Sequence, residues 1–321
     1  MYTRFRIRCW PLLLSALLAA SAWANEGAQK PTDAKKDLVL RGDAVCTRCH
    51  DAGEEFPVLA IGRTRHGTTA DGRTPTCTSC HGSSIQHVNK PEGATTRPRP
   101  DVSFKGKAQT AATAINETCS SCHQGGKRMH WPGSAHESRD VSCTSCHQVH
   151  TQHDKVLDKR TQLETCLGCH KEQRAQLNRP SHHPLKDGKM ACTDCHNPHG
   201  AAGEKMLVRD NVNETCYTCH MEKRGPFLRG HQPVAENCGN CHNPHGSIND
   251  NMLKVRAPFL CTQCHEPTSH RGNIAGVTGG TPGGTASGIG VTLARSCVNC
   301  HTNIHGTNNP ASITNERTFR R

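Results

Sequence analysis

Polar positions dominate this chain, and apolar positions follow a helical period only in short segments such as 155–163 and 165–177. Pro and Gly residues end these segments early. Two stretches, Pro91–Pro100 and Gly272–Gly290, are rich in turn-forming residues and predict loops. The pattern therefore predicts short α-helices, much irregular backbone and almost no β-sheet.

One apolar run, Pro11–Ala22, lies near the N-terminus and is too short to cross a bilayer. Three arginines precede it and Ala22-Trp23-Ala24 follows it, which is the pattern of a secretory signal peptide cleaved before Asn25. Cys9 lies in the removed segment. No later stretch is apolar enough to span a membrane alone, so we expect a product in a bacterial periplasm that is soluble or held by a partner.

Cysteine and histidine recur in one motif, Cys-x-x-Cys-His, which occurs ten times and which we number motif 1 to motif 10 in chain order. This is the attachment site of haem c, because the two thiols add across the vinyl groups of one porphyrin and the histidine binds the iron. Zinc ribbons and disulfide frameworks do not need the histidine. The cysteines are Cys46 and Cys49, Cys77 and Cys80, Cys119 and Cys122, Cys143 and Cys146, Cys166 and Cys169, Cys192 and Cys195, Cys216 and Cys219, Cys238 and Cys241, Cys261 and Cys264, and Cys297 and Cys300. The proximal histidines are His50, His81, His123, His147, His170, His196, His220, His242, His265 and His301.

Ten haems change what the amino-acid composition implies about the core and the net charge. Hydrophobic residues make up 33% and aromatic residues 3% of the chain, which is close to the composition of a disordered protein. Ten apolar macrocycles would supply the missing core, so we expect the apoprotein to be largely unfolded. The formal charge of +12 falls to +9 without the signal peptide, and ten oxidised haems with ionised propionates add roughly −10. With no aromatic platform beside the basic residues, we expect no nucleic-acid partner.

Thirteen further histidines of the mature chain can supply the second axial ligands, and ten are needed. From motif 4 on, even-numbered motifs carry a second histidine almost immediately and odd-numbered motifs carry theirs later, so a two-haem unit recurs about every 50 residues. The repeat predicts bis-histidine ligation by ten distal histidines: His66, His87, His136, His150, His183, His199, His231, His245, His270 and His305. His182 is an alternative to His183, which Pro184 favours by fixing the backbone beyond it. Methionine is a weaker candidate because histidines are in surplus.

A histidine three residues after an attachment histidine cannot reach the opposite face of the same iron. Three residues span at most ~10 Å, too little for the chain to pass around the macrocycle edge. We therefore expect His150, His199 and His245 to bind the irons of neighbouring haems. Which distal histidine serves which haem stays open.

A coarser repeat predicts two five-haem halves. Asn116-Glu-Thr-Cys119 matches Asn213-Glu-Thr-Cys216, and the next two motifs follow each copy at nearly the same spacing. The expected organisation is a signal peptide (1–24), a lead segment (25–42), a first half (43–190), a second half (191–308) and a C-terminal tail (309–321).

Residues around the motifs carry a resemblance to a known family. They include Cys146-His-Gln-Val-His150, Ser181-His-His-Pro-Leu-Lys186, Cys219-His-Met-Glu-Lys-Arg-Gly-Pro226 and the segment 236–264. Over nearly all of residues 43–310 the chain resembles the MtrA/MtoA/PioA/DmsE family of periplasmic decahaem c-type cytochromes. The resemblance implies an elongated multihaem cytochrome c, with short helices and irregular backbone wrapped around ten haems. It also implies an electron carrier that inserts into an outer-membrane β-barrel porin.

The expected function is a transmembrane electron conduit for extracellular metal reduction or ferrous iron oxidation. Ten haems in a row need to advance only about 4 to 5 Å each to cover the roughly 40 to 45 Å of a bilayer with its headgroups. Expected partners are the porin and periplasmic or inner-membrane cytochromes, with an extracellular multihaem cytochrome as a further candidate. The expected location is the periplasm, at the outer membrane through a partner.

Two other functions compete with the conduit. A free periplasmic electron shuttle that docks with reductases is the main alternative. An enzyme is disfavoured, because ten distal histidines are enough to fill every iron and multihaem catalysis needs an open position. The direction of electron flow and the haem potentials depend on burial and local charge, so they stay open.

Overall fold

A computed structural model describes residues 38–50, 57–67, 74–106, 109–265, 297–299 and 301–309. Contacts divide the chain into two compact parts, Met1–Asp37 and Leu38–Arg321, and every described residue lies in the second part. The predicted signal peptide, the loop 272–290, His270, Cys300 and most of the lead segment and the C-terminal tail lie outside the described residues. The two five-haem halves stay a prediction.

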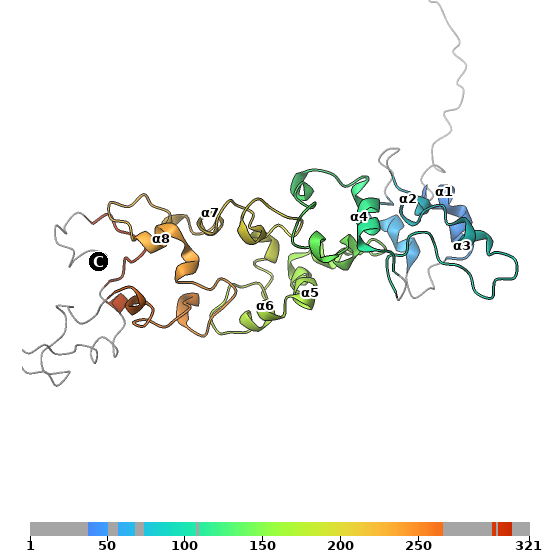
Figure 1. Ribbon diagram of the computed structural model, residues 1–321. Helices are drawn as coiled ribbons and strands as arrows, with labels where there is room; N and C mark the ends of the chain where they lie inside the picture. Colours follow the sequence, from blue (N-terminus) through green and yellow to red (C-terminus); the bar gives the residue numbers. More distant parts are fainter. Residues whose placement is uncertain are drawn as a thin grey trace, which may run out of the picture. The chain divides into compact units, whose positions relative to one another are not determined.

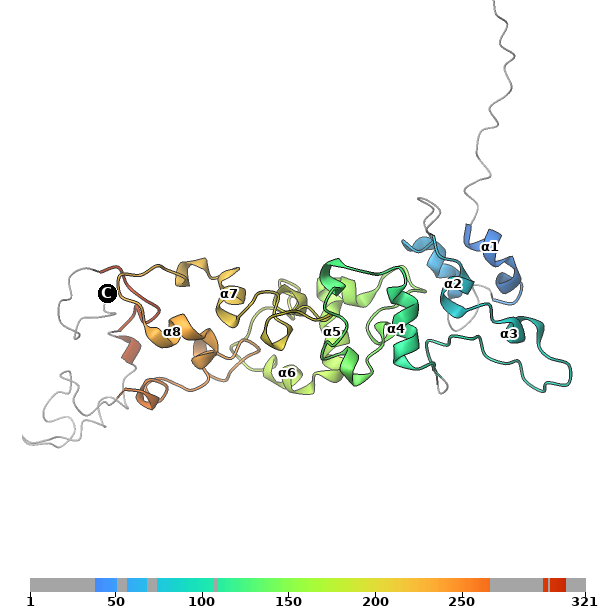
Figure 2. The same cartoon turned by 45° about the horizontal axis from the view of Figure 1, so that its top comes forward.

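Short helices joined by long irregular segments make up the described chain (Figure 1; Figure 2). The α-helices are α1 (Leu38–Thr47), α2 (Cys77–His81), α3 (Ile85–Asn89), α4 (Ala112–Ser120), α5 (Lys159–Cys169), α6 (Lys171–Gln176), α7 (Val212–Tyr217) and α8 (Gln232–Glu236). The 3-10 helices are η1 (Val58–Arg63), η2 (Gly126–Arg128), η3 (Glu137–Arg139), η4 (Cys143–Ser145), η5 (Lys155–Leu157), η6 (Cys192–Asp194), η7 (Glu204–Met206), η8 (Met221–Lys223), η9 (Cys238–Asn240), η10 (Asp250–Met252), η11 (Cys261–Gln263) and η12 (Cys297–Asn299). No helix in these ranges is long and apolar enough to cross a membrane.

The prediction of short helices with almost no sheet is confirmed. Extended pairing among the described residues is limited to isolated bridges, such as Ser181 with Ser247 and Arg229 with Thr307. The predicted loop Pro91–Pro100 contains turns and irregular backbone. The backbone is therefore held by local turns and by the side-chain contacts described below.

The helices predicted between residues 155 and 177 have different boundaries from those expected. Asp158 caps α5 with its side chain, and the helix then continues through Glu164, which lies between the two expected segments 155–163 and 165–177. Glutamate is a good helix former, whereas aspartate at an N-cap favours a helix start. The break falls instead at His170, whose backbone leaves the helical region (φ −80°, ψ 72°).

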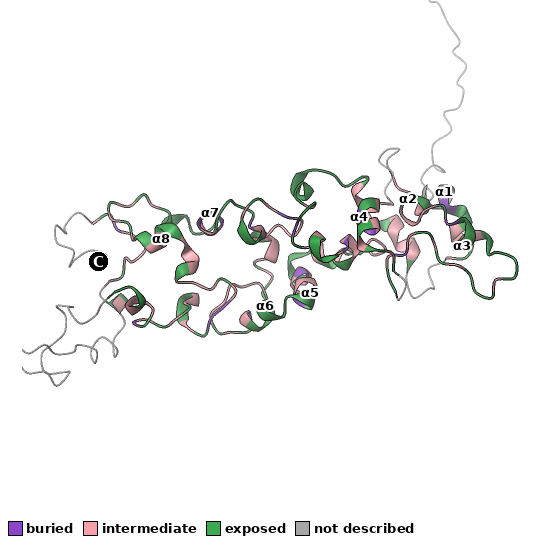
Figure 3. Ribbon diagram, in the orientation of Figure 1, coloured by how far each residue is buried: buried purple, intermediate pink, exposed green. Residues whose placement is uncertain are grey.

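The interior of the described chain is a cavity rather than a packed apolar core. Its few buried hydrophobic residues are Ile115, Leu167, Leu177, Ala191, Leu207 and Tyr217. Most of the ribbon is exposed or intermediate (Figure 3). One continuous cavity of about 3070 Å³ is lined by cysteines or histidines of each of motifs 1 to 8. Such an interior fits a fold whose core is completed by prosthetic groups.

Candidate haem-binding sites

Each motif forms one turn of helix. In the nine motifs outside α2, the backbone N–H of the histidine donates to the carbonyl of the first cysteine at 2.9 to 3.1 Å, as in Cys119–His123 and Cys143–His147. Motif 2 coincides with α2 itself. Positions i, i+3 and i+4 of a helical turn share one face. The turn therefore presents both cysteines and the histidine to the same side, as attachment of one porphyrin requires.

Nine attachment histidines each face one distal histidine. The pairs are His50 with His87, His66 with His123, His81 with His150, His136 with His170, His147 with His199, His183 with His220, His196 with His245, His231 with His265, and His242 with His305. Every distal histidine in these pairs is one that the repeat selected. His301 of motif 10 is described, but His270, the tenth of the predicted distal histidines, is not.

The spacing within the pairs suits a metal ion between two imidazoles. Ring centroids lie 5.7 to 6.4 Å apart. A bond of about 2.0 Å from each ring nitrogen to a first-row metal, plus about 1.1 Å from nitrogen to ring centre on each side, gives about 6.2 Å. Direct ring stacking does not require that value in nine separate places. The residues present therefore fit a bis-histidine iron.

A simple rule relates the pairs to the order of the motifs. From motif 2 to motif 8, the histidine of an even-numbered motif faces the distal histidine that follows the next even-numbered motif, as His147 faces His199. From motif 3 to motif 9, the histidine of an odd-numbered motif faces a distal histidine that lies just before the preceding even-numbered motif, as His220 faces His183. Only motif 1 among these nine takes a partner, His87, from its own two-motif unit. Successive units are therefore interlocked.

The spare histidines are placed differently. His183 faces His220 at a centroid distance of 6.4 Å, whereas Nδ1 of His182 lies 2.6 Å from the carbonyl oxygen of Arg179. No histidine ring pair in the described part of the chain includes His130, His153 or His182. The geometry favours His183 over His182, and the ligand assignment itself stays a prediction.

Hydrogen bonds orient many of the paired rings. Nδ1 lies 2.7 to 3.0 Å from a backbone carbonyl oxygen in His81, His87, His136, His150, His183, His196 and His242. A ring that donates from Nδ1 keeps Nε2 unprotonated, which is the form that binds iron. His147 differs, because its Nδ1 lies 2.6 Å from the Oδ2 carboxylate oxygen of Asp154.

Cysteines join the two motifs of each unit. The thiol of Cys119 donates to the sulfur of Cys143, which raises the pKa of Cys119 and lowers that of Cys143. The same donation runs from Cys166 to Cys192, from Cys216 to Cys238 and from Cys261 to Cys297. In the first unit the direction is reversed, because the thiol of Cys77 donates to Cys46. The first cysteines thus place the attachment sites of one unit side by side.

A second set of cysteine interactions connects one unit to the next. Burial raises the pKa of the Cys80 thiol, and the nearby Cys122 of motif 3 raises it further. Cys146 is affected in the same way by burial and then by Cys169 of motif 5. Corresponding interactions link Cys195 with Cys219 and Cys241 with Cys264. Consecutive attachment sites therefore neighbour one another from motif 1 to motif 10.

Buried amide side chains, which the sequence did not single out as site residues, fix the motifs within a unit. Oδ1 of Asn116 accepts the backbone N–H of Cys143 at 2.8 Å, and Oδ1 of Asn213 accepts that of Cys238 at 2.7 Å. Gln162 accepts the backbone N–H of Thr193 in the third unit. The repeated Asn-Glu-Thr-Cys segment was the available signal, but the partner of the amide becomes visible only in the fold.

Glycines allow the turns that follow two distal histidines. Gly200 and Gly246 have φ of 99° and 136°, and each follows the histidine of a Cys-His-Asn-Pro-His-Gly segment. A Cβ atom at Gly246 would lie 2.3 Å from the carbonyl oxygen of Gln176, and one at Gly200 would lie 2.1 Å from that of His130. These close approaches explain why glycine occupies both positions.

Comparisons with known proteins agree with the motif pattern. A family model described as a doubled CXXCH motif matches residues 182–225 and 231–270, and one described as cytochrome c-type protein NrfB-like matches residues 77–162. The chain is 42% identical over 317 residues to the multiheme cytochrome MtrA of Shewanella baltica, covering 93% of this chain and 92% of that protein. It is 26% identical over 190 residues to the cytochrome c-type protein NrfB of Haemophilus influenzae, covering 50% of this chain and 82% of that protein. Each doubled-motif segment contains one complete ring pair, His183 with His220 or His231 with His265.

Proposed function

Because the chain belongs to the MtrA family of multihaem c-type cytochromes, electron-transfer proteins with covalently bound haem c, we propose that it is a decahaem electron conduit. In this proposal it carries ten bis-histidine haems and spans the outer membrane inside a β-barrel porin. When bound, each haem supplies an iron that alternates between the ferric and ferrous states. The protein determines the order in which the ten haem-binding sites follow one another.

The observation that carries this proposal is the interlocking of histidine pairs across successive units. Each unit contributes ligands to the next one and takes ligands from it, as His199 and His136 do for motifs 4 and 5. Cysteine contacts join the same sites in the same order. An uninterrupted series of neighbouring sites is what a conduit requires, whereas a catalyst needs only one special site.

Saturation of the irons supports electron transfer without substrate chemistry. Nine attachment histidines have a distal histidine at metal-bridging distance. A bis-histidine iron changes oxidation state with little change in its ligands and offers no position to a substrate. The proposed location is the periplasm at the outer membrane, with periplasmic or inner-membrane cytochromes exchanging electrons at one end.

Proteoliposomes test the proposal. Liposomes are loaded with a reduced dye, the holoprotein is reconstituted with its candidate porin, and a ferric chelate is added outside. The dye loses electrons and external iron gains them, so dye absorbance reports transport. We expect oxidation only when both proteins are present. Matched controls contain porin alone, the cytochrome alone, or the porin with haem-free chain.

The same assay separates the main alternative. A free periplasmic shuttle would oxidise the dye in solution as fast as the conduit does, but would give no porin-dependent oxidation across the liposome membrane. It would also fail to co-purify with the porin at equal stoichiometry. Those results together would replace the conduit by the shuttle.

A further inference from the structure

The position three residues before the first cysteine of an odd-numbered motif has a constant role in two units. Asn116 precedes Cys119 and Asn213 precedes Cys216. Both asparagines are buried, and the side-chain amide of each also donates to a backbone carbonyl just before the next motif. Oδ1 of Asn116 lies 3.1 Å from the sulfur of Cys143 as well. A neutral amide therefore sits between the attachment cysteines of these units.

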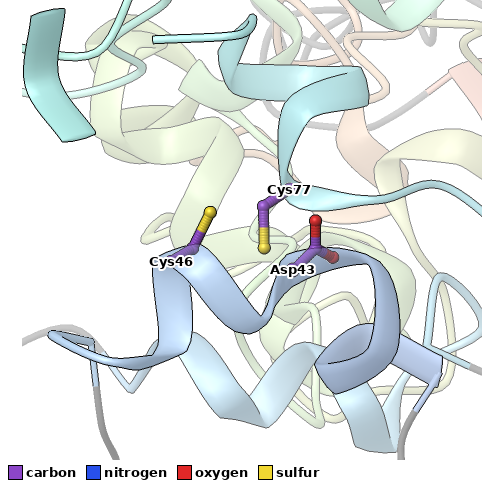
Figure 4. A group of neighbouring side chains, drawn as sticks. All are labelled: Asp43, Cys46 and Cys77. Carbon is purple, nitrogen blue, oxygen red and sulfur yellow. The ribbon is translucent and has the colours of Figure 1, made fainter. Parts of the chain in front are cut away.

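In the first unit the same position is occupied by Asp43. This residue precedes Cys46 by three positions and is fully buried, with 0% of its surface exposed. One of its carboxylate oxygens and the sulfurs of Cys46 and Cys77 all lie within 4.8 Å of one another (Figure 4). Asp43 thus lies beside the first cysteines of motifs 1 and 2, as Asn116 lies beside the first cysteine of motif 4.

No nitrogen or hydroxyl group in the described part of the chain donates a hydrogen bond to the Asp43 carboxylate. The donor beside it is the Cys77 thiol: burial first, and then a hydrogen bond with Asp43, raise the pKa of this thiol to about 12. Thioether formation removes the thiol hydrogens of Cys46 and Cys77, so these sulfurs can neither neutralise the carboxylate nor form a thiolate metal site with it.

We propose that Asp43 is a positioning and electrostatic residue that lowers the reduction potentials of the haems attached at motifs 1 and 2. Ferric iron carries one more positive charge than ferrous iron, so a buried negative charge nearby stabilises the oxidised form. The corresponding residues of other units are neutral: Asn116, Gln162 one position earlier in the third unit, and Asn213. Among these corresponding positions, the one in the first unit carries a carboxyl group.

The consequence concerns the distribution of electrons along the series. With Asp43 the first pair is harder to reduce than it would be with asparagine at this position, so an electron passing the first pair meets a higher energetic step. This inference rests on the proposed haem loading but does not depend on the porin.

Replacement of Asp43 by Asn gives the first unit the residue already present in the second and fourth units. Redox titration by absorbance and protein-film voltammetry is performed on the full-length holoprotein after mass spectrometry has counted its haems. We expect two of the ten one-electron components to move to higher potential. For the more affected one, the equilibrium constant for reduction should rise about tenfold, which corresponds to 59 mV for one electron.

The reciprocal variant and a surface control make the test specific. Asn116→Asp should lower two components, because it places the charge between motifs 3 and 4. Asp187→Asn, at an exposed carboxylate, should move none. If Asp43→Asn loses haem, the result from Asn116→Asp decides whether a charge at this position controls the potentials.

Unchanged potentials in Asp43→Asn with all ten haems retained would overturn the proposal, because they would mean that Asp43 is uncharged or too well screened to matter. A downward shift would overturn it as well. If the measured mass of the wild-type holoprotein corresponds to fewer than ten haems, the proposed number of haems is contradicted instead. Loss of porin-dependent electron transport would contradict the conduit. These failures are therefore distinguishable.

Discussion

Replacement of His183 by Ala tests the distal ligands at a place where the chain provides its own control. The ring of His183 faces His220 at 6.4 Å, whereas adjacent His182 is held by its contact with the carbonyl oxygen of Arg179. Alanine at position 183 removes the only ring that faces His220 in the described chain. One iron in ten should lose its sixth ligand and become high-spin, while nine stay low-spin.

The measurement is quantitative because each iron that loses its sixth ligand adds one high-spin iron per chain. Electron paramagnetic resonance of the oxidised His183→Ala variant should show high-spin ferric iron that integrates to one per chain. Cyanide should bind with the same stoichiometry. The matched His182→Ala variant should show neither signal. High-spin iron in His182→Ala, or its absence in His183→Ala, would refute the ligand assignment.

Three further predictions follow from particular contacts. Asp154→Asn removes the carboxylate that accepts from His147, so one component of the redox titration should move upward, and an unchanged titration would show that this contact does not tune the iron. Gly246→Ala should destabilise the holoprotein by ~2 kcal/mol or more, because φ is 136° and the new Cβ would meet the carbonyl oxygen of Gln176; thermal unfolding followed by haem absorbance should show a lower midpoint, with Ala at exposed Gly93 giving a smaller loss. Chain produced without haem attachment should give the circular dichroism of an unfolded protein, and a native-like helical spectrum would contradict the role of haem as the core.

The sequence alone predicts the attachment sites because their chemistry is local. A helical turn brings the three functional residues of Cys-x-x-Cys-His together, and this holds whatever surrounds it. The distal candidates followed from the phase of the repeat, whereas the expectation that His150, His199 and His245 serve other haems followed from the short reach of three residues. Each of these three faces an attachment histidine of a different motif.

The pairing and the supporting contacts could not be predicted from local pattern. His81 and His150 lie in different units, and only the fold brings them to 6.3 Å. The significance of Asn116 depends on the position of the Cys143 backbone N–H, and that of Asp43 depends on burial beside Cys77. The helix boundaries expected from segments 155–163 and 165–177 were wrong because Asp158 and His170 set the ends of α5.

The central claim is that ligands shared between alternate motifs tie ten haems into one continuous series. A density map of the oxidised holoprotein, at a resolution that shows both axial ligands of each iron, measures this directly. The account predicts density from His147 and His199 to one iron, from His196 and His245 to another, and likewise for the remaining pairs. An iron bound by both His147 and His150, or one that has a single histidine ligand, would contradict it.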